Sequence, residues 1–283
     1  MHIPIYGLEE NLLDKKTGIS YNLSTIYNDC PNHTHNHYEF FIVIDGSALH
    51  MINSAVQTIT KGDFFLIRPS DVHFYNFYHS ENFKILNLGF TQQLFQNVST
   101  FLGRGLQLQV LTGAEFPPRV FLSEEGFHQV KSAMEEIGRL IKTGHSRHIR
   151  AHAMCMIALF LEDYFILDND TQNPWTDLPS WLSEVMLNMQ KIENLQAGYP
   201  RMCQLAPCSP NHLCRTMKKQ LGQTPTQYIN TQRLNYSIYL LTQTDLDILD
   251  ICETCGFSNL SHFYHLFQKQ FGQSPIRFRR EKI

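Results

Sequence analysis

Between residues 20 and 90 the hydrophobic residues fall in short runs that are separated by turn residues. The run at 40–44 (FFIVI) is apolar and partly β-branched, and it ends at an Asp-Gly pair, which favours a turn. Residues 64–67 and 83–90 form similar runs, and residues 51–59 fit a hairpin. Short strands at such regular spacing predict a small barrel or jelly roll.

From Ser123 onward apolar residues recur every three or four positions, which predicts an amphipathic helix with Ser123 as its N-cap. A second helix, from about 148 to 167, is apolar over much of its surface. Two such helices beyond a barrel fit either of two roles, packing in the core or forming a dimer face, and the sequence leaves both open.

The stretch 168–179 (DNDTQNPWTDLP) is polar and contains two prolines, which indicates a linker. Beyond it the chain has the pattern of helices joined by tight turns. We therefore predict an α+β chain with three parts: an N-terminal barrel domain with its two helices at 1–167, a linker at 168–183, and an all-helical domain at 184–283.

Charge is unevenly divided along the 283 residues, whose formal net charge is −3. From Glu184 to the end there are 11 Lys and Arg against 7 Asp and Glu, a net of +4, so the preceding part carries −7. An acidic part joined to a basic part fits a sensor attached to a nucleic-acid-binding unit. No apolar run has the length of a membrane span and the N-terminus lacks a secretion signal, so we expect a cytoplasmic protein without a membrane partner.

An internal repeat is the most informative feature of the C-terminal part. Residues 219–228 (KQLGQTPTQY) and 269–278 (KQFGQSPIRF) align without a gap at a shift of fifty. Upstream in the same register, His212 matches His262 and Met217 matches Phe267. Chance similarity of this length, with Gly and Pro in register, is improbable, so the chain contains two copies of one structural unit.

Each copy has the pattern of a helix-turn-helix unit. A residue able to cap a helix (Ser209 in the first copy; Ser258 or Asn259 in the second) precedes a helix of about three turns, which ends at Gly222 or Gly272. The second helix of such a unit enters the major groove, and two units joined by a spacer helix at 226–241 would read groove segments roughly 34 Å apart.

The stretch 248–275 (ILDICETCGFSNLSHFYHLFQKQFGQSP) resembles the signature of AraC-type transcription regulators, and the resemblance covers the last hundred residues. It implies a seven-helix domain with two helix-turn-helix units that binds a double-stranded DNA operator. Many such regulators carry an N-terminal cupin-like barrel that binds an effector. We therefore expect a transcription regulator, an activator or a repressor, with a small-molecule effector, RNA polymerase and a second copy of the chain as partners.

The whole chain also resembles regulators of bacterial chitobiose operons. The shared features are the HxHxxxEF start, a GDF turn, an ILNLG strand and a WL pair after the linker. This closer resemblance implies control of a sugar-utilisation operon by a chitobiose-derived or other amino sugar, free or as a sugar phosphate.

Outward positions of the two second helices are the candidate DNA contacts. Asn211 is the expected reader of adenine and Arg215 of guanine, because each side chain can pair bidentately with that base. His265 occupies the position equivalent to Arg215 and carries little charge at neutral pH, so we predict that the second unit contributes less affinity. For each residue the alternative is a merely solvated helix face. The complete set is Asn211, His212, Cys214, Arg215, Lys218, Asn259, Ser261, His262 and His265.

A cluster of histidines, HTHNHYEF at 33–40, opens the barrel. Alternate residues of a strand share a face, so the histidines and Glu39 are expected to point the same way. The spacing HxHx3Ex6G resembles the first cupin motif, and residues 62–73 resemble the second. By that resemblance the ligands of a divalent metal such as Zn, Ni, Fe or Mn would be His33, His35, Glu39 and His73.

Three roles for this cluster remain open from the sequence. It would make the chain a metal-dependent cupin enzyme acting on a sugar, or bind the effector with or without a metal, or be purely structural. The helix-turn-helix repeat favours effector binding over catalysis, so we expect no enzyme. The residues expected at the effector are His37, at the barrel mouth, with Tyr38 and Tyr75.

Overall fold

A computed structural model describes residues 5–6, 16–26, 30–76, 83–144, 146–166 and 178–282. The chain divides into two compact units. The first, here the barrel unit, comprises Met1–Asn53 and Thr58–Pro174, and the second, the helical unit, comprises Ser54–Gln57 and Trp175–Ile283. Residues 168–177 of the predicted linker lie outside the described residues.

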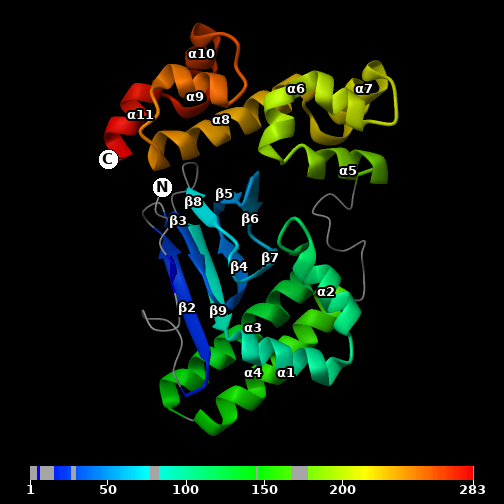
Figure 1. Cartoon of the computed structure of the whole chain (residues 1–283), viewed down its shortest axis with the longest axis vertical. Helices are drawn as coiled ribbons and strands as arrows, with labels where there is room; N and C mark the ends of the chain where they lie inside the picture. The colour runs from blue at the N-terminus through cyan, green and yellow to red at the C-terminus, as the bar shows by residue number, and fades with distance from the viewer. Residues whose placement is uncertain are drawn as a thin grey trace. The chain divides into compact units, whose positions relative to one another are not determined.

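Two five-stranded sheets form the barrel (Figure 1). One has the strand order β1-β3-β8-β5-β6 and the other β10-β7-β4-β9-β2. The predicted combination of a cupin-like barrel with a helical domain is confirmed. The strands are β1 (Ile5–Tyr6), β2 (Ile19–Ile26), β3 (Cys30–His35), β4 (Tyr38–Asp45), β5 (Ser47–Ile52), β6 (Ala55–Thr60), β7 (Asp63–Ile67), β8 (His73–Asn76), β9 (Phe83–Phe90) and β10 (Arg119–Phe121).

The run FFIVI lies on strand β4 and is apolar without alternation, because both faces of this strand are buried. Phe40 and Ile42 face the core that the second sheet shares with the helices. Phe41 and Val43 face the core inside the barrel. Because both faces of the strand are covered, neither alternate position can be polar without burying an unpaired group.

The helices of the barrel unit cover the outer face of the second sheet. Ser123 caps α3 as predicted, accepting a hydrogen bond from the backbone N–H of Gly126. Val130 of α3 and Ile157 of α4 are fully buried in the shared core, so one face of each helix packs in the core, and the alternative role as a dimer face stays a prediction for the other face. Figure 1 shows α1, α3 and α4 grouped beside β2 and β9. The helices are α1 (Gln92–Leu102), α2 (Gly105–Gly113), α3 (Glu124–Thr143) and α4 (Ser146–Phe160), followed by the π-helical turn η1 (Leu161–Ile166).

The helical unit repeats one motif twice about a long central helix. Gly222 and Gly272 end α7 and α10 in the left-handed conformation, with φ of 68° and 74°. Helix α8 joins the two copies and is the predicted spacer, as Figure 1 shows. The helices are α5 (Ser180–Asn188), α6 (Ile192–Leu205), α7 (Pro210–Leu221), α8 (Pro225–Gln243), α9 (Ile248–Thr254), α10 (Leu260–Phe271) and α11 (Pro275–Lys282).

Candidate DNA-binding surface and barrel site

Helices α7 and α10 each bury one face and expose the other. On α7, Leu213 and Met217 are fully buried, and on α10 Phe263 and Phe267 occupy the same positions, as the repeat predicts. Cys214 is half-buried. The remaining predicted DNA contacts are exposed: Asn211, His212, Arg215 and Lys218 in the first unit, and Asn259, Ser261, His262 and His265 in the second.

Capping orients the start of both helices. Ser209 Oγ accepts a hydrogen bond from the His212 backbone N–H, and Asn259 Oδ1 accepts one from the His262 backbone N–H at 2.9 Å. Asn259 is therefore engaged as the N-cap of α10, with its amide N–H₂ left for an acceptor. The imidazole of His212 also lies against the Trp181 ring on α5, with ring centroids 5.9 Å apart, a contact that the sequence did not suggest.

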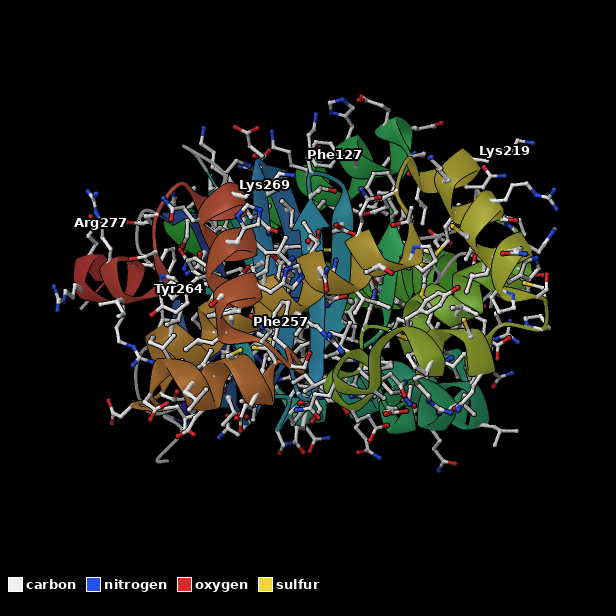
Figure 2. All side chains as sticks on the ribbon, turned by 90° about the horizontal axis from the view of Figure 1, so that it is seen from above. Phe127, Lys219, Phe257, Tyr264, Lys269 and Arg277 are labelled. Atoms are coloured by element: carbon white, nitrogen blue, oxygen red, sulfur yellow. The ribbon has the colours of Figure 1, made fainter. Side chains whose placement is uncertain are left out.

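The two helix-turn-helix copies differ in the positive charge of their recognition helices. Helix α7 carries three cations, Arg215, Lys218 and Lys219, whereas α10 carries Lys269 alone. Figure 2 labels Lys219 and Lys269, the pair that the fifty-residue repeat makes equivalent. Because phosphate contacts depend on Lys and Arg, α7 is the better equipped helix for phosphate neutralisation.

Arg233 on α8 links segments of both helix-turn-helix copies within the helical unit, and the sequence analysis did not single it out. Its guanidinium donates to the backbone carbonyls of Leu195 and Gln196 at 2.8 and 2.9 Å. A Cβ on Gly198 or on Gly256 would lie 2.6 or 2.9 Å from Arg233 Nη2, so both glycines give the guanidinium its space. Burial lowers the pKa of Arg233 from its usual value.

Inside the barrel, three candidate ligands converge at the end of β3 and the start of β4. Ligand atoms of His35, His37 and Glu39 all lie within 4.8 Å of one another, and no other such group of three occurs among the described residues. His35 Nε2 is 4.0 Å from Glu39 Oε2. All three side chains are buried, with exposures of 3%, 2% and 8%.

A second row of rings lies beside this group. The ring centroids of His33 and His73 lie 4.0 Å apart, and His73 Nδ1 is hydrogen-bonded to Tyr75 Oη at 2.8 Å. Tyr75 stacks on His50, whose role the sequence did not reveal although it is a polar residue within an apolar strand. The predicted residues His33, His73 and Tyr75 therefore line the same interior but do not belong to the compact group of three.

Tyr38 lies elsewhere in the barrel unit. It precedes Glu39 on β4 and so points to the opposite side of the sheet. Its ring stacks on Phe95 of α1, with centroids 4.1 Å apart, and packs against the core shared with the helices. The structure therefore does not bring Tyr38 together with His37 and Tyr75.

Burial sets the protonation of the group of three. It lowers the pKa of His35 to about 3 and that of His37 to about 4, and it raises the pKa of Glu39 to about 8. At neutral pH both imidazoles are therefore uncharged and the carboxyl of Glu39 holds its proton. Neutral imidazole is the form that accepts hydrogen bonds and binds metals.

Comparison with known proteins matches both units. Residues 23–143 match an AraC-like ligand binding domain, and residues 202–281 match a helix-turn-helix domain. The chain belongs to the AraC family. A ligand-binding domain joined to a helix-turn-helix domain is the composition of a DNA-binding regulator. No helix in the described part of the chain is both long and apolar enough to cross a membrane.

Among the AraC-family relatives are named transcriptional activators. The HTH-type transcriptional activator RhaS of Escherichia fergusonii is 26% identical over 88% of this chain and 87% of its own length. RhaR of an Enterobacter strain is 26% identical over 87% of this chain and 86% of its own length. A solved regulator of Chromobacterium violaceum with an AraC-type DNA-binding domain is 29% identical over 36% of this chain and 91% of its own, with a TM-score of 0.33. The two named activators do not narrow the family to regulators of chitobiose operons.

Proposed function

We propose that this AraC-family chain binds a specific DNA operator and controls sugar-utilisation genes in response to a small effector held in its barrel. The two exposed recognition helices at a fixed spacing along α8 are the observation that carries the DNA-binding half. Activation of transcription, through contact with RNA polymerase, is the mode that the names of the relatives favour.

The polar interior of the barrel supports the effector half. His35 Nε2, His37 Nδ1, Glu39 Oε1 and His73 Nε2 are buried without a hydrogen-bond partner. A buried polar atom without a partner costs about 1–3 kcal/mol, so a hydroxyl-rich ligand that satisfied several of them would bind with a sizeable gain. A sugar has such hydroxyls, and the chitobiose-type amino sugar or its phosphate remains the proposed effector.

Dimer formation through the barrel unit is a further part of the proposal. Leu159 on α4 is 59% exposed, and an apolar groove of about 360 Å³ lies beside it between α3 and α4. A second copy covering this groove would bring two helical units to one operator. Gel filtration of the wild type against Leu159→Glu tests this part, with a shift to the monomer expected for the variant.

Operator binding by the full chain is the decisive experiment. Duplex DNA from upstream of the chain's own gene is titrated with protein, with and without chitobiose, its phosphate and N-acetylglucosamine. We expect sequence-specific binding that one of these sugars changes at least tenfold. Binding that ignores every sugar would overturn the choice of effector, and failure to prefer the upstream DNA over random duplex would overturn the regulator itself.

A further inference from the structure

The group His35, His37 and Glu39 has two features that hydrogen bonding to a sugar does not require: its ligand atoms lie close together, and one of its rings is held in a fixed orientation. The His35 imidazole is fixed by a hydrogen bond of 2.8 Å between its Nδ1 and the backbone carbonyl of His37. A carbonyl oxygen can only accept, so Nδ1 carries the hydrogen and Nε2 of the neutral ring presents a lone pair. Metal-binding histidines are oriented by this same kind of bond.

The remaining ligand atoms are close enough to share one ion. Two ligand bonds of about 2.1 Å meeting at a tetrahedral angle place their donors about 3.4 Å apart. His35 Nε2 and Glu39 Oε2 are 4.0 Å apart, and the three ligand atoms lie within 4.8 Å. Movements of up to about 0.7 Å per donor would bring these separations to the tetrahedral value.

Burial adds a second, independent observation. His35 Nε2, His37 Nδ1 and Glu39 Oε1 all lack a hydrogen-bond partner although they are buried. In native proteins such atoms are usually hydrogen-bonded, and several unpartnered atoms in one cluster call for an explanation such as a bound ion or an ordered water. Three protein atoms of this type would leave a coordination position open in a tetrahedral site.

We propose that His35, His37 and Glu39 bind one divalent transition-metal ion, whose open position takes an oxygen of the effector. Binding of an effector oxygen at the open position rests on the proposed effector-sensing function, whereas the metal site itself does not. Binding of the ion would displace the proton of Glu39. Two imidazole nitrogens and one carboxylate then select Zn²⁺, Ni²⁺ or Fe²⁺ over Mg²⁺ and Ca²⁺, which prefer oxygen ligands throughout.

This set differs from the one that the cupin motif implies, because His37 replaces His33 and His73. His73 Nδ1 already bonds the Tyr75 hydroxyl, and the His33 ring lies against His73. His73 Nε2 is also buried without a hydrogen-bond partner, but neither His33 nor His73 belongs to the group whose ligand atoms lie within 4.8 Å of one another. The difference between His33 and His37 is what makes the proposal testable by substitution.

Metal content of the full chain is the test. Protein is stripped with chelator, incubated with one equivalent of Co²⁺ or Zn²⁺ and desalted, and bound metal is measured by elemental analysis and by the visible absorption of Co²⁺. We expect about one ion per wild-type chain and at least a 10- to 100-fold weaker affinity in His37→Gln and Glu39→Gln. His33→Gln and His128→Gln, the latter at an exposed position on α3, are expected to bind like the wild type.

Two results would overturn the metal site: a wild-type chain that retains no ion, or a loss of metal in His33→Gln equal to that in His37→Gln. Folding is monitored separately by circular dichroism, and Glu39→Gln keeps the size of the side chain if His37→Gln does not fold. Addition of chitobiose to the Co²⁺-loaded chain is expected to shift the Co²⁺ absorption. A sugar response that persists unchanged in chelator would refute the open coordination position while leaving the proposed function standing.

Discussion

Arg215 and His265 occupy equivalent positions fifty residues apart, and their replacement by alanine tests whether the two recognition helices are unequal. Both side chains are exposed on the outward faces of α7 and α10. Arg215 adds a permanent charge beside Lys218 and Lys219, whereas His265 shares its helix with Lys269 alone. We expect Arg215→Ala to weaken operator binding much more than His265→Ala.

The size of the difference follows from the two contacts that an arginine can make. Loss of one phosphate-neutralising cation lowers the slope of log K against log salt by about 0.9. If Arg215 pairs with guanine, loss of that bidentate contact costs about 1–3 kcal/mol, which corresponds to roughly 5- to 150-fold in affinity. His265 can lose one neutral hydrogen bond, about 1 kcal/mol or fivefold, with little change in the salt slope.

Fluorescence anisotropy with labelled operator DNA, repeated over a series of salt concentrations, measures both quantities for the full chain. Lys142→Ala, an exposed change at the end of α3 in the barrel unit, controls for a general loss of positive charge. Equal losses of affinity and equal changes of slope in Arg215→Ala and His265→Ala would refute the reasoning.

Two further substitutions and a pH series test the packing, hydrogen bonds and protonation around these sites. Phe267→Ala should lower the free energy of unfolding by about 3–5 kcal/mol in urea titrations, because it empties a fully buried position. Arg233→Met should lower the affinity for the operator by a larger fraction than it lowers the helix content, because two hydrogen bonds that join distant segments of the chain are lost. In the presence of chelator, the free energy of unfolding should fall as the pH drops from 6.5 to 4.5. In the folded chain His35 and His37 stay neutral over this range, because their pKa values are about 3 and 4, whereas in the unfolded chain both become protonated. Glu39, with its pKa of about 8, opposes this fall, and a flat profile from pH 6.5 to 4.5 would contradict the assignment.

The helical unit was predictable because its signals are local. Glycine after a helix, proline at its start and apolar residues every three or four positions act within a few residues of one another. The repeat presented each signal twice, so the cap at Ser209 and the buried face at Met217 and Phe267 followed directly, and of the two predicted caps of the second copy, Ser258 and Asn259, the structure has Asn259. The unequal charge of the two units was equally plain from the sequence.

The ligand set of the barrel was less predictable, because strand alternation does not extend through the turn. Strand β3 ends at His35 and β4 begins at Tyr38, so His37 lies in a bend between them. The direction of a side chain in a bend depends on the path of the backbone and not on a period of two. Here the His37 carbonyl accepts from His35, and its imidazole turns into the interior.

Arg233 shows a third kind of residue, one whose importance no local pattern carries. Its partners Leu195 and Gln196 lie 37 or 38 positions away on α6, and its neighbour Gly256 belongs to the turn of the second unit. Gly198 and Gly256 both have positive φ and both border the same guanidinium, so a side chain at either would displace it. One arginine on α8 therefore contacts both repeated units at once. The fifty-residue repeat does not contain this contact, so the pattern that revealed the two copies could not reveal it.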